Sequence, residues 1–267
     1  MQKWLIALPL IFSFFSFTLH LLGRQKYMVF NFVKKKLSFA LSGRYLCSAN
    51  GQKLISYMCG LVKPQEPNKM YSFKIKDYAK AINNSDIKDS SQIKKDLKEI
   101  ASKDVWIDVI NDDYPDVKIL HWVKKIIYSN DEVKFEIDPM LSPYLLPTNS
   151  RKDMLAYPID NISKLTRANS IRLYEFFLGL YTEAYNKDSK KLNNNHFECV
   201  ETVLLAKLRL ITNSCVSWDY SKFAIFEKEV LSPCINEINL FTNIHVRYVL
   251  YSSGKKATKL KLYIRKK

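Results

Sequence analysis

The clearest alternation of apolar and polar positions lies near the C-terminus. Between Ser221 and Asn239 apolar residues recur at intervals of three and four, which predicts an amphipathic helix. Two runs of period two follow, from Ile244 to Tyr248 and from Leu260 to Ile264, and this period predicts half-buried strands. A turn at 252–256 separates them and completes a hairpin. A helix followed by such a hairpin is the order of a winged helix.

Pro233 falls inside the predicted helix, where proline removes a hydrogen bond and clashes with the carbonyl of Glu229. Two arrangements fit the sequence. Either the helix kinks at this point, or Ser232 caps a second helix that has Pro233 at its first position. The sequence alone does not choose between these two arrangements.

The preceding part of the chain repeats the order of helices followed by strands. Its predicted elements are a helix at 50–62, a strand at 71–75, helices at 76–83 and 91–102, and strands at 105–109, 117–128 and 133–137. A polar stretch with Pro147 then predicts a linker. After it come a helix at 167–185, an Asn- and Lys-rich loop at 186–195, a brief strand at 197–199, a helix at 200–210 and a turn at 212–219. We therefore predict an α+β chain of two tandem winged-helix domains, 36–147 and 153–267.

An apolar segment, residues 1–27, precedes these domains. Trp4 to Gly23 has no residue charged at neutral pH and is long enough to span a bilayer. The segment fits an upstream mis-assigned start, with the functional chain beginning near Met28, or a membrane anchor, or less readily a cleaved signal peptide, since no A-x-A-like site follows. As an anchor, the lysines and arginines after it would keep the body in the cytoplasm.

The distribution of charge narrows the classes of molecule that the protein is expected to bind. The formal net charge is +16, and residues 1–150 carry 22 basic against 15 acidic residues while residues 151–267 carry 20 against 11. Both halves are basic, as expected of a protein that lies along a polyanion. The end of the chain is the most one-sided part, because seven of the residues from Lys255 to Lys267 are basic and none is acidic. Net charge alone does not separate nucleic acid from an anionic membrane.

Catalytic and metal-binding patterns are weak. The five cysteines form no CxxC pair, which suits a reducing cytoplasm, and His196 with Cys199 and Cys215 lacks a recognisable zinc spacing. Five aspartates at 104, 108, 112, 113 and 116 lie in a predicted strand and its turn, where aspartate is ordinary. The chain carries no P-loop, G-x-G-x-x-G or nucleophile elbow. We expect no metal, no cofactor and no enzymatic activity.

Three separated motifs resemble one family. The stretch Val230 to Asn239 (VLSPCINEIN) is similar to a vL-x-P-a-i-x-E-I-N motif, Ser170 to Glu175 (SIRLYE) resembles an a-i-R-L-Y-E helix, and Gly43 to Ile55 resembles an s-R-Y-x-L-s opening. The family is that of the replication initiators of iteron-containing plasmids, built from two winged-helix domains. The resemblance runs from about Lys36 to the C-terminus.

The resemblance implies a function in plasmid replication. Monomers would bind directly repeated iterons at the origin, help to open the neighbouring AT-rich duplex, and recruit the host initiator and replicative helicase. Dimers, joined largely through the first domain, would bind an inverted repeat and repress the initiator's own gene. Two other classes compete with this reading: a winged-helix repressor, soluble or tethered through the N-terminal segment, and an enzyme acting on nucleic acid.

The expected DNA contacts lie in the second domain. Family members often carry a basic cluster where this chain has Glu227-Lys228-Glu229, so a single cation remains there. Near phosphate a carboxylate is repelled, although it can accept from a cytosine amino group. The candidates are Tyr220, Ser221, Lys222 and Lys228 on the helix, Lys207 and Arg209 before the turn, and Lys255, Lys256 and Lys259 on the wing.

Overall fold

The computed structural model describes residues 32–83, 90–110, 115–129, 131–146, 150–187, 197–253 and 256–267. The apolar segment 1–27 and its three interpretations lie outside these residues. Within them, no helix combines the length and the apolarity needed to cross a bilayer.

The first half begins with a strand that the sequence did not predict. Its elements are β1 (Phe32–Lys36), α2 (Leu37–Ser42), β2 (Arg44–Tyr45), α3 (Ala49–Leu61), β3 (Tyr71–Lys74), α4 (Ile75–Ala81), α5 (Ser90–Ser102), β4 (Asp104–Ile110), β5 (Pro115–His121), β6 (Val123–Ser129), β7 (Glu132–Ile137) and α6 (Ser142–Leu145). The three predicted helices of this half are confirmed to within two residues.

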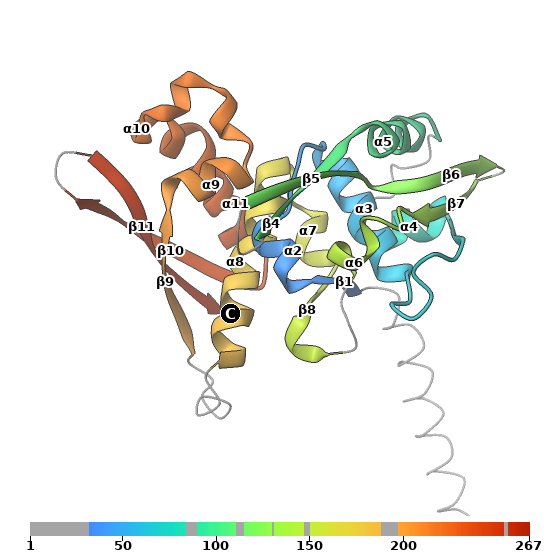
Figure 1. Cartoon of the computed structure of the whole chain (residues 1–267), viewed down its shortest axis with the longest axis horizontal. Helices are drawn as coiled ribbons and strands as arrows, with labels where there is room; N and C mark the ends of the chain where they lie inside the picture. Colours follow the sequence, from blue (N-terminus) through green and yellow to red (C-terminus); the bar gives the residue numbers. More distant parts are fainter. Residues whose placement is uncertain are drawn as a thin grey trace, which may run out of the picture.

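The second half is built around one long helix, α8 (Ala168–Lys187) (Figure 1). Before it come the 3-10 turn η2 (Arg151–Asp153), β8 (Met154–Pro158) and α7 (Asp160–Ser163). After it follow β9 (Glu198–Leu204), α9 (Leu205–Ile211), η3 (Ser214–Val216), η4 (Trp218–Ser221), α10 (Phe223–Phe226), η5 (Glu227–Leu231), α11 (Ser232–Phe241), β10 (Ile244–Ser253) and β11 (Lys256–Lys266).

The two halves repeat one topology. In the first, α3, β3, α4 and α5 lead to the hairpin β6–β7, and the sheet has the order β3-β7-β6. In the second, α8, β9, α9 and α10 to α11 lead to the hairpin β10–β11, and the order is β10-β11-β9. In both sheets the last strand therefore lies between the other two. The predicted pair of winged helices is confirmed.

The region around residue 200 corrects the sequence prediction. A helix was expected from Val200 to Leu210, but residues 198–204 form β9 and the helix begins only at Leu205. All seven residues of β9 pair with β11, from Glu198 opposite Arg265 to Leu204 opposite Lys259. Local apolar spacing fits either structure at this length, and the strand partner decided it.

The predicted strand 117–128 is also wrong, because it is two strands. Trp122 separates β5 from β6, which belong to different sheets. Its side chain is buried and contacts the edges of Phe39 and Tyr45, with ring centroids 6.0 and 4.9 Å away. The turn therefore carries the largest side chain of this part of the core.

The structure excludes one of the two arrangements considered for Pro233. Leu231 and Ser232 both have right-handed helical dihedrals, so Ser232 does not cap a new helix. The five residues before it, η5, form a π-helical turn that joins α10 to α11. A π turn changes the hydrogen-bond spacing, which lets the helix pass a residue that has no N–H to donate.

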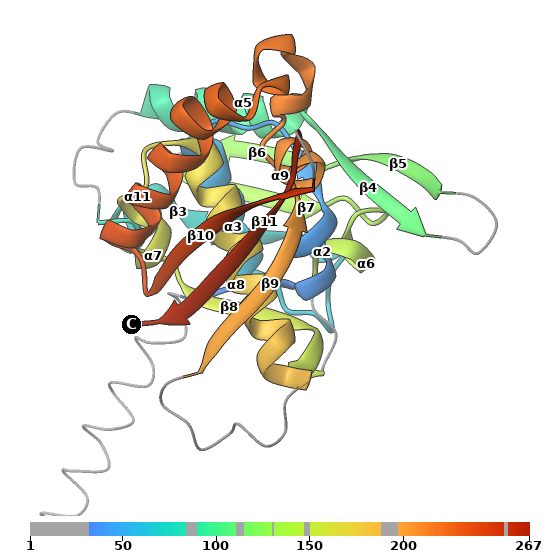
Figure 2. The ribbon, with the colours of Figure 1, turned by 90° about the vertical axis from the view of Figure 1, so that its left-hand side faces the viewer.

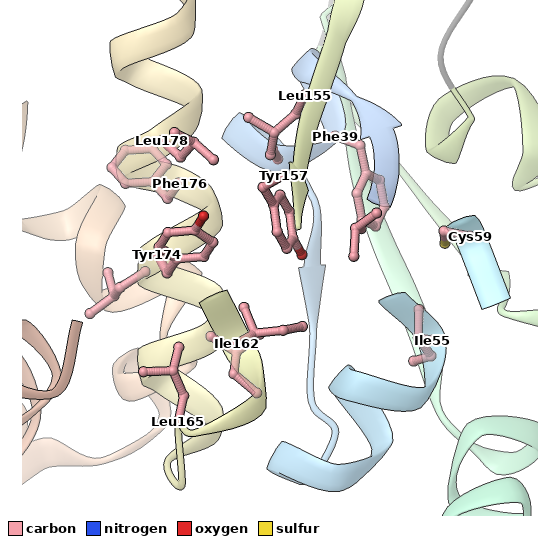
Figure 3. Close-up of a cluster of buried hydrophobic side chains, with 14 of the residues drawn as sticks. Phe39, Ile55, Cys59, Leu155, Tyr157, Ile162, Leu165, Tyr174, Phe176 and Leu178 are labelled. Carbon is pink, nitrogen blue, oxygen red and sulfur yellow. The ribbon is translucent and has the colours of Figure 1, made fainter. Parts of the chain in front are cut away.

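Helix α8 lies at the centre of a core that continues through both halves. Figure 3 shows Tyr174 and Leu178 of this helix on the side that faces Leu155 and Tyr157 of β8, and the rings of Tyr174 and Tyr157 lie edge to face with their centroids 5.2 Å apart. In turn, β8 pairs in antiparallel register with β1. The linker predicted near Pro147 is thus followed by a strand that is paired with the start of the chain, and the exact domain limits stay a prediction.

A buried ion pair joins the halves at this point. Lys35 Nζ lies 2.6 Å from Glu175 Oε1 and donates to Ser56 Oγ at 3.1 Å, while Tyr45 and Tyr157 both donate hydroxyl hydrogen bonds to Glu175. Burial alone would raise the pKa of Glu175, but the charges of Lys35 and Arg172 and these hydrogen bonds outweigh it and hold the pKa below its usual range.

Candidate nucleic-acid interface

The helix before the second hairpin is the equivalent of a recognition helix. Phe226 and Leu231 are fully buried beneath it, whereas Lys222 and Lys228 are exposed on its outer side. Ser221, exposed at the end of η4, precedes them. Three of the nine predicted contact residues are thus exposed to solvent, and their contact with DNA stays a prediction.

Two residues of the C-terminal motif fix this helix in place. Glu237 accepts hydrogen bonds from the backbone N–H and the hydroxyl of Thr166, both at 2.6 Å, just before α8 begins. Asn239 bonds the backbone of Val246 in β10 through its amide nitrogen (2.8 Å) and its amide oxygen (2.7 Å). Glu237 and Asn239 therefore set the angle of the helix against α8 and the wing.

The acidic run beside Lys228 is partly engaged within the protein. The Tyr248 hydroxyl donates to Glu227 Oε1 at 2.7 Å and lies 3.0 Å from Ser232 Oγ. Because Glu227 is held toward the wing strand, Glu229 is the carboxylate of this run that remains exposed. The hydrogen bond ties Glu227 to β10, but a neutral hydroxyl does not offset the charge of a carboxylate, so the departure from the basic family pattern stands.

Arg209 and Tyr220 contact the fold itself. Arg209 donates to the carbonyl of Ser221 at 3.0 Å, and its guanidinium lies 5.5 Å from the centroid of the Phe226 ring. Burial lowers the pKa of Arg209. Tyr220 is half-buried and packs against the core. Both residues therefore position the start of α10.

Lys207 lies between the two halves. It lines a cleft of about 620 Å³ together with Asp108 of β4, Arg209 and Ser221. Burial lowers the pKa of Lys207, the carboxylate of Asp108 counteracts this, and Arg172 and Arg44 add to the lowering. Asp108 is paired with Arg44 at 2.5 Å. Lys207 is therefore placed beside the first half, and Arg209 lines the same cleft.

On the wing, Lys259 is exposed on β11 opposite Tyr251. Lys255 lies outside the described residues, and Lys256 is described only as the first residue of β11. The alternation of the hairpin is confirmed, because Leu260, Leu262 and Ile264 are fully buried while Lys259, Lys261 and Arg265 are exposed.

The sequence analysis missed a second basic helix surface. Helix α5 occupies the place in the first half that α10 to α11 occupy in the second, and its residues Lys94, Lys95 and Lys98 are exposed. Lys94 Nζ also lies 4.9 Å from the ring centroid of Tyr128 in the adjoining hairpin. The repeated order of elements, combined with the lysines on the polar face of this helix, was the signal that could have found it.

The helix motif in α8 is structural. Arg172 is buried and donates to the carbonyl oxygens of Ala40 and Gly43 at 2.8 and 2.7 Å, and its neighbour Glu175 accepts from Lys35. Both of these motif residues join the two halves. Among the described residues, no group of three or more His, Cys, Asp or Glu is arranged to hold a metal ion.

Two family models match the chain. The model for the first winged-helix domain (WH1) of initiator replication proteins covers residues 32–178, and the model for the second (WH2) covers residues 206–264. A comparison with curated protein sequences gives no match. One similar solved structure is that of the Pi initiator protein in complex with iteron DNA, with 15% identity and a TM-score of 0.68 over 90% of this chain and 98% of that chain. At this identity, the likeness shows a shared fold.

Proposed function

Because this chain belongs to the initiator replication proteins, the family built from two winged-helix domains, we propose that it initiates plasmid replication by binding directly repeated iterons at the origin. The single observation that carries this proposal is the repeat of the winged helix with a basic surface on each copy. Helices α5 and α10 lie along the same side of the molecule in both Figure 1 and Figure 2.

That arrangement fits one duplex that contacts both halves. Lys222 and Lys228 would lie at the major groove with Ser221 and Tyr220, and the wing lysines Lys255, Lys256 and Lys259 would contact phosphate or the minor groove. Lys207 and Arg209 complete the predicted contacts. Lys94, Lys95 and Lys98 on α5 would add phosphate contacts from the first half. The protein acts by binding, and we expect this function in the cytoplasm.

A second copy of the chain is the partner that fits the first half. Strand β5 forms the edge of the sheet β2-β4-β5, and Trp106, Val117 and Ile119 on this hairpin are 42%, 47% and 55% exposed. An apolar edge strand with unpaired backbone groups favours pairing with another chain. The homodimer would bind an inverted repeat and repress the gene, whereas the monomer would bind iterons and recruit the host initiator and helicase.

Footprinting on DNA that flanks the chain's own gene tests the function. Regularly spaced protection over direct repeats is expected at physiological salt, together with autonomous replication when gene and repeats are joined. Protection of one inverted repeat alone would indicate a repressor. Cleavage of a supercoiled origin that depends on metal would indicate an enzyme. To test the dimer, Ile119→Lys should shift the protein toward monomer in sedimentation without loss of iteron binding.

A further inference from the structure

The middle of the helical segment from α10 to α11 is the π turn η5, and Lys228 and Glu229 are exposed charged residues within it. The hydrogen bonds of a π turn span one more residue than those of an α-helix, so the turn rotates its side chains about the helix axis relative to a regular helix. The directions in which Lys228 and Glu229 point therefore depend on the turn keeping its shape.

The backbone and the apolar core fix that shape only in part. Pro233 follows shortly after the turn and has no N–H, so one carbonyl of the turn lacks the hydrogen bond that residue 233 would otherwise donate. On the inner side, Val230 and Leu231 are buried. Apolar contact is non-directional, so this packing holds the turn against the core but sets its rotation less strictly. A directional contact has to come from another element.

The wing supplies a directional contact through Tyr248 of β10. Its hydroxyl donates to Glu227 Oε1 at 2.7 Å and lies 3.0 Å from Ser232 Oγ. Because the tyrosine hydrogen points to the carboxylate, the tyrosine oxygen can accept from the Ser232 hydroxyl. Glu227 is the first residue of the π turn and Ser232 is the residue that follows its end. A single hydroxyl group therefore spans the whole turn.

The Tyr248 side chain is itself held in place. Its ring is half-buried and packs against the core. Burial raises the pKa of Tyr248, so the hydroxyl keeps the proton that it donates at neutral pH. Two residues earlier in the same strand, the backbone of Val246 is bonded to the Asn239 amide at 2.8 and 2.7 Å. Strand β10 thus holds the helical segment at two points, Glu227 in the π turn and Asn239 in α11.

We propose that Tyr248 is a positioning residue for recognition of the base sequence, because its hydroxyl holds the π turn in the rotation that presents Lys228 and Glu229 to the major groove. The proposal rests on the proposed function in one respect, which is that this helix lies in the groove of a duplex. A lysine that donates to guanine and a carboxylate that accepts from the cytosine amino group both need a defined direction. Phosphate contacts carry no sequence information and need it less.

The test begins by selecting, from a random library, the duplex that the wild-type full chain prefers, so that no iteron has to be known. Fluorescence anisotropy then gives the affinity for this duplex and for a scrambled one. Tyr248→Phe removes the hydroxyl and keeps the ring. It should lower the ratio of the two affinities about fivefold, the usual effect of one hydrogen bond, and leave the salt slope unchanged, because no phosphate contact is lost.

Matched variants separate the hydrogen bond from the charge and from the aromatic ring. Glu227→Ala and Glu227→Gln remove the same charge, but glutamine keeps an oxygen that can accept from Tyr248. Discrimination should therefore fall about fivefold with alanine and stay within about twofold with glutamine. Tyr263→Phe is the control, since Tyr263 lies on the opposite face of the sheet, where its ring stacks on Arg247.

Hydrogen exchange of the backbone amides of residues 227–231 gives a second readout that needs no DNA. Tyr248→Phe should raise the exchange rates in this turn about fivefold, because the bond that closes it is lost, whereas Tyr263→Phe should leave them unchanged. Retained binding to the scrambled duplex shows that each variant folds.

Unchanged discrimination in Tyr248→Phe would overturn the proposal, and a lower melting temperature as the sole effect would give Tyr248 a role in packing alone. Equal losses with Glu227→Gln and Glu227→Ala would assign the effect to charge and would overturn it as well. If the wild type selects a sequence that is not repeated beside its own gene, the proposed iteron function fails while the assignment of Tyr248 stands. A wild type that prefers no sequence would overturn both.

Discussion

The two winged helices share one topology but differ in where their charge lies. The hairpin β6–β7, residues 123–137, has three basic and three acidic residues and a net charge of zero. The hairpin β10–β11, residues 244–266, has seven basic residues and no acidic one. In the first wing Lys124 is paired with Glu136 at 2.9 Å and Lys134 with Glu132 at 3.5 Å. Only the second wing is therefore suited to lie against phosphate.

The helices show a second difference. Helix α5 is a regular helix with three exposed lysines, whereas its counterpart passes through a π turn before Pro233. The first half also inserts the hairpin β4–β5 between its helix and its wing. One topology thus yields a half suited to backbone contact and pairing and a half suited to reading a groove.

Breaking the connection between the halves should have the largest effect. Glu175→Ala leaves Lys35 buried without its partner, and removing one member of a buried ion pair costs roughly 3–5 kcal/mol of unfolding free energy. Urea denaturation followed by circular dichroism measures this. The exposed pair of Glu183 with Lys187 supplies the control, because Glu183→Ala should change stability by less than about 1 kcal/mol. Equal effects of the two variants would contradict the role of Glu175.

Substitutions on the two basic helices should separate recognition of the base sequence from contact with the DNA backbone. Lys222→Ala with Lys228→Ala should reduce discrimination between an iteron and a scrambled duplex by about 1–3 kcal/mol. Lys94→Ala with Lys98→Ala should instead weaken both duplexes alike and lower the salt slope by about two. Titrations at several salt concentrations measure both quantities. If the α5 variant lost discrimination between the iteron and the scrambled duplex, the first half would take part in recognising the base sequence, contrary to this assignment.

Acid should loosen the recognition helix through Glu237. Burial raises the pKa of Glu237, but hydrogen bonds from Ser170 and Thr166 and the backbone N–H groups of Thr166 and Arg167 outweigh it and lower the pKa. A lowered pKa means stability that is present above the unfolded value of about 4.3 and is lost as pH falls through the folded value. Glu237→Gln should cost about 1 kcal/mol at neutral pH and less at acid pH. A constant difference across pH in thermal unfolding would exclude this role.

The smallest expected effect compares single lysines of the two wings. Lys259→Ala should lower the salt slope of duplex binding by about 0.9, the value for one phosphate contact in a duplex. Lys134→Ala, in the neutral wing, should leave the slope unchanged. Equal slopes for both variants would place Lys259 in solvent and remove the distinction between the wings.

The spacing of apolar residues and the distribution of charge predicted many features of the fold. The alternation from Ile244 to Tyr248 and from Leu260 to Ile264 identified the second wing, since one face of a hairpin on a core must be apolar. The motif containing Arg172 and Glu175 pointed to the family, yet it did not reveal that both residues join the halves. Their partners Ala40, Gly43 and Lys35 lie more than a hundred residues away, so no local pattern contains them.

The wrong sequence predictions have the same physical origin, which is contact between residues distant in the chain. Residues 200–204 fit a helix or a strand until β11 is present to pair with them, and residues 117–128 read as one strand until Trp122 is placed in the core. Likewise, Lys207 and Arg209 read as free cations, but tertiary packing places one beside Asp108 and the other on Phe226.

The sequence by itself determined the fold class, the repeated order of helices and hairpins, and the basic end of the chain, because these follow from periods of two and 3.6 and from composition. The tertiary structure decided which strand β9 pairs with, how the helix passes Pro233, how α8 joins the halves and which cations stay exposed. Those features depend on contacts between residues distant in the chain, and their free energy exists only once the core has formed.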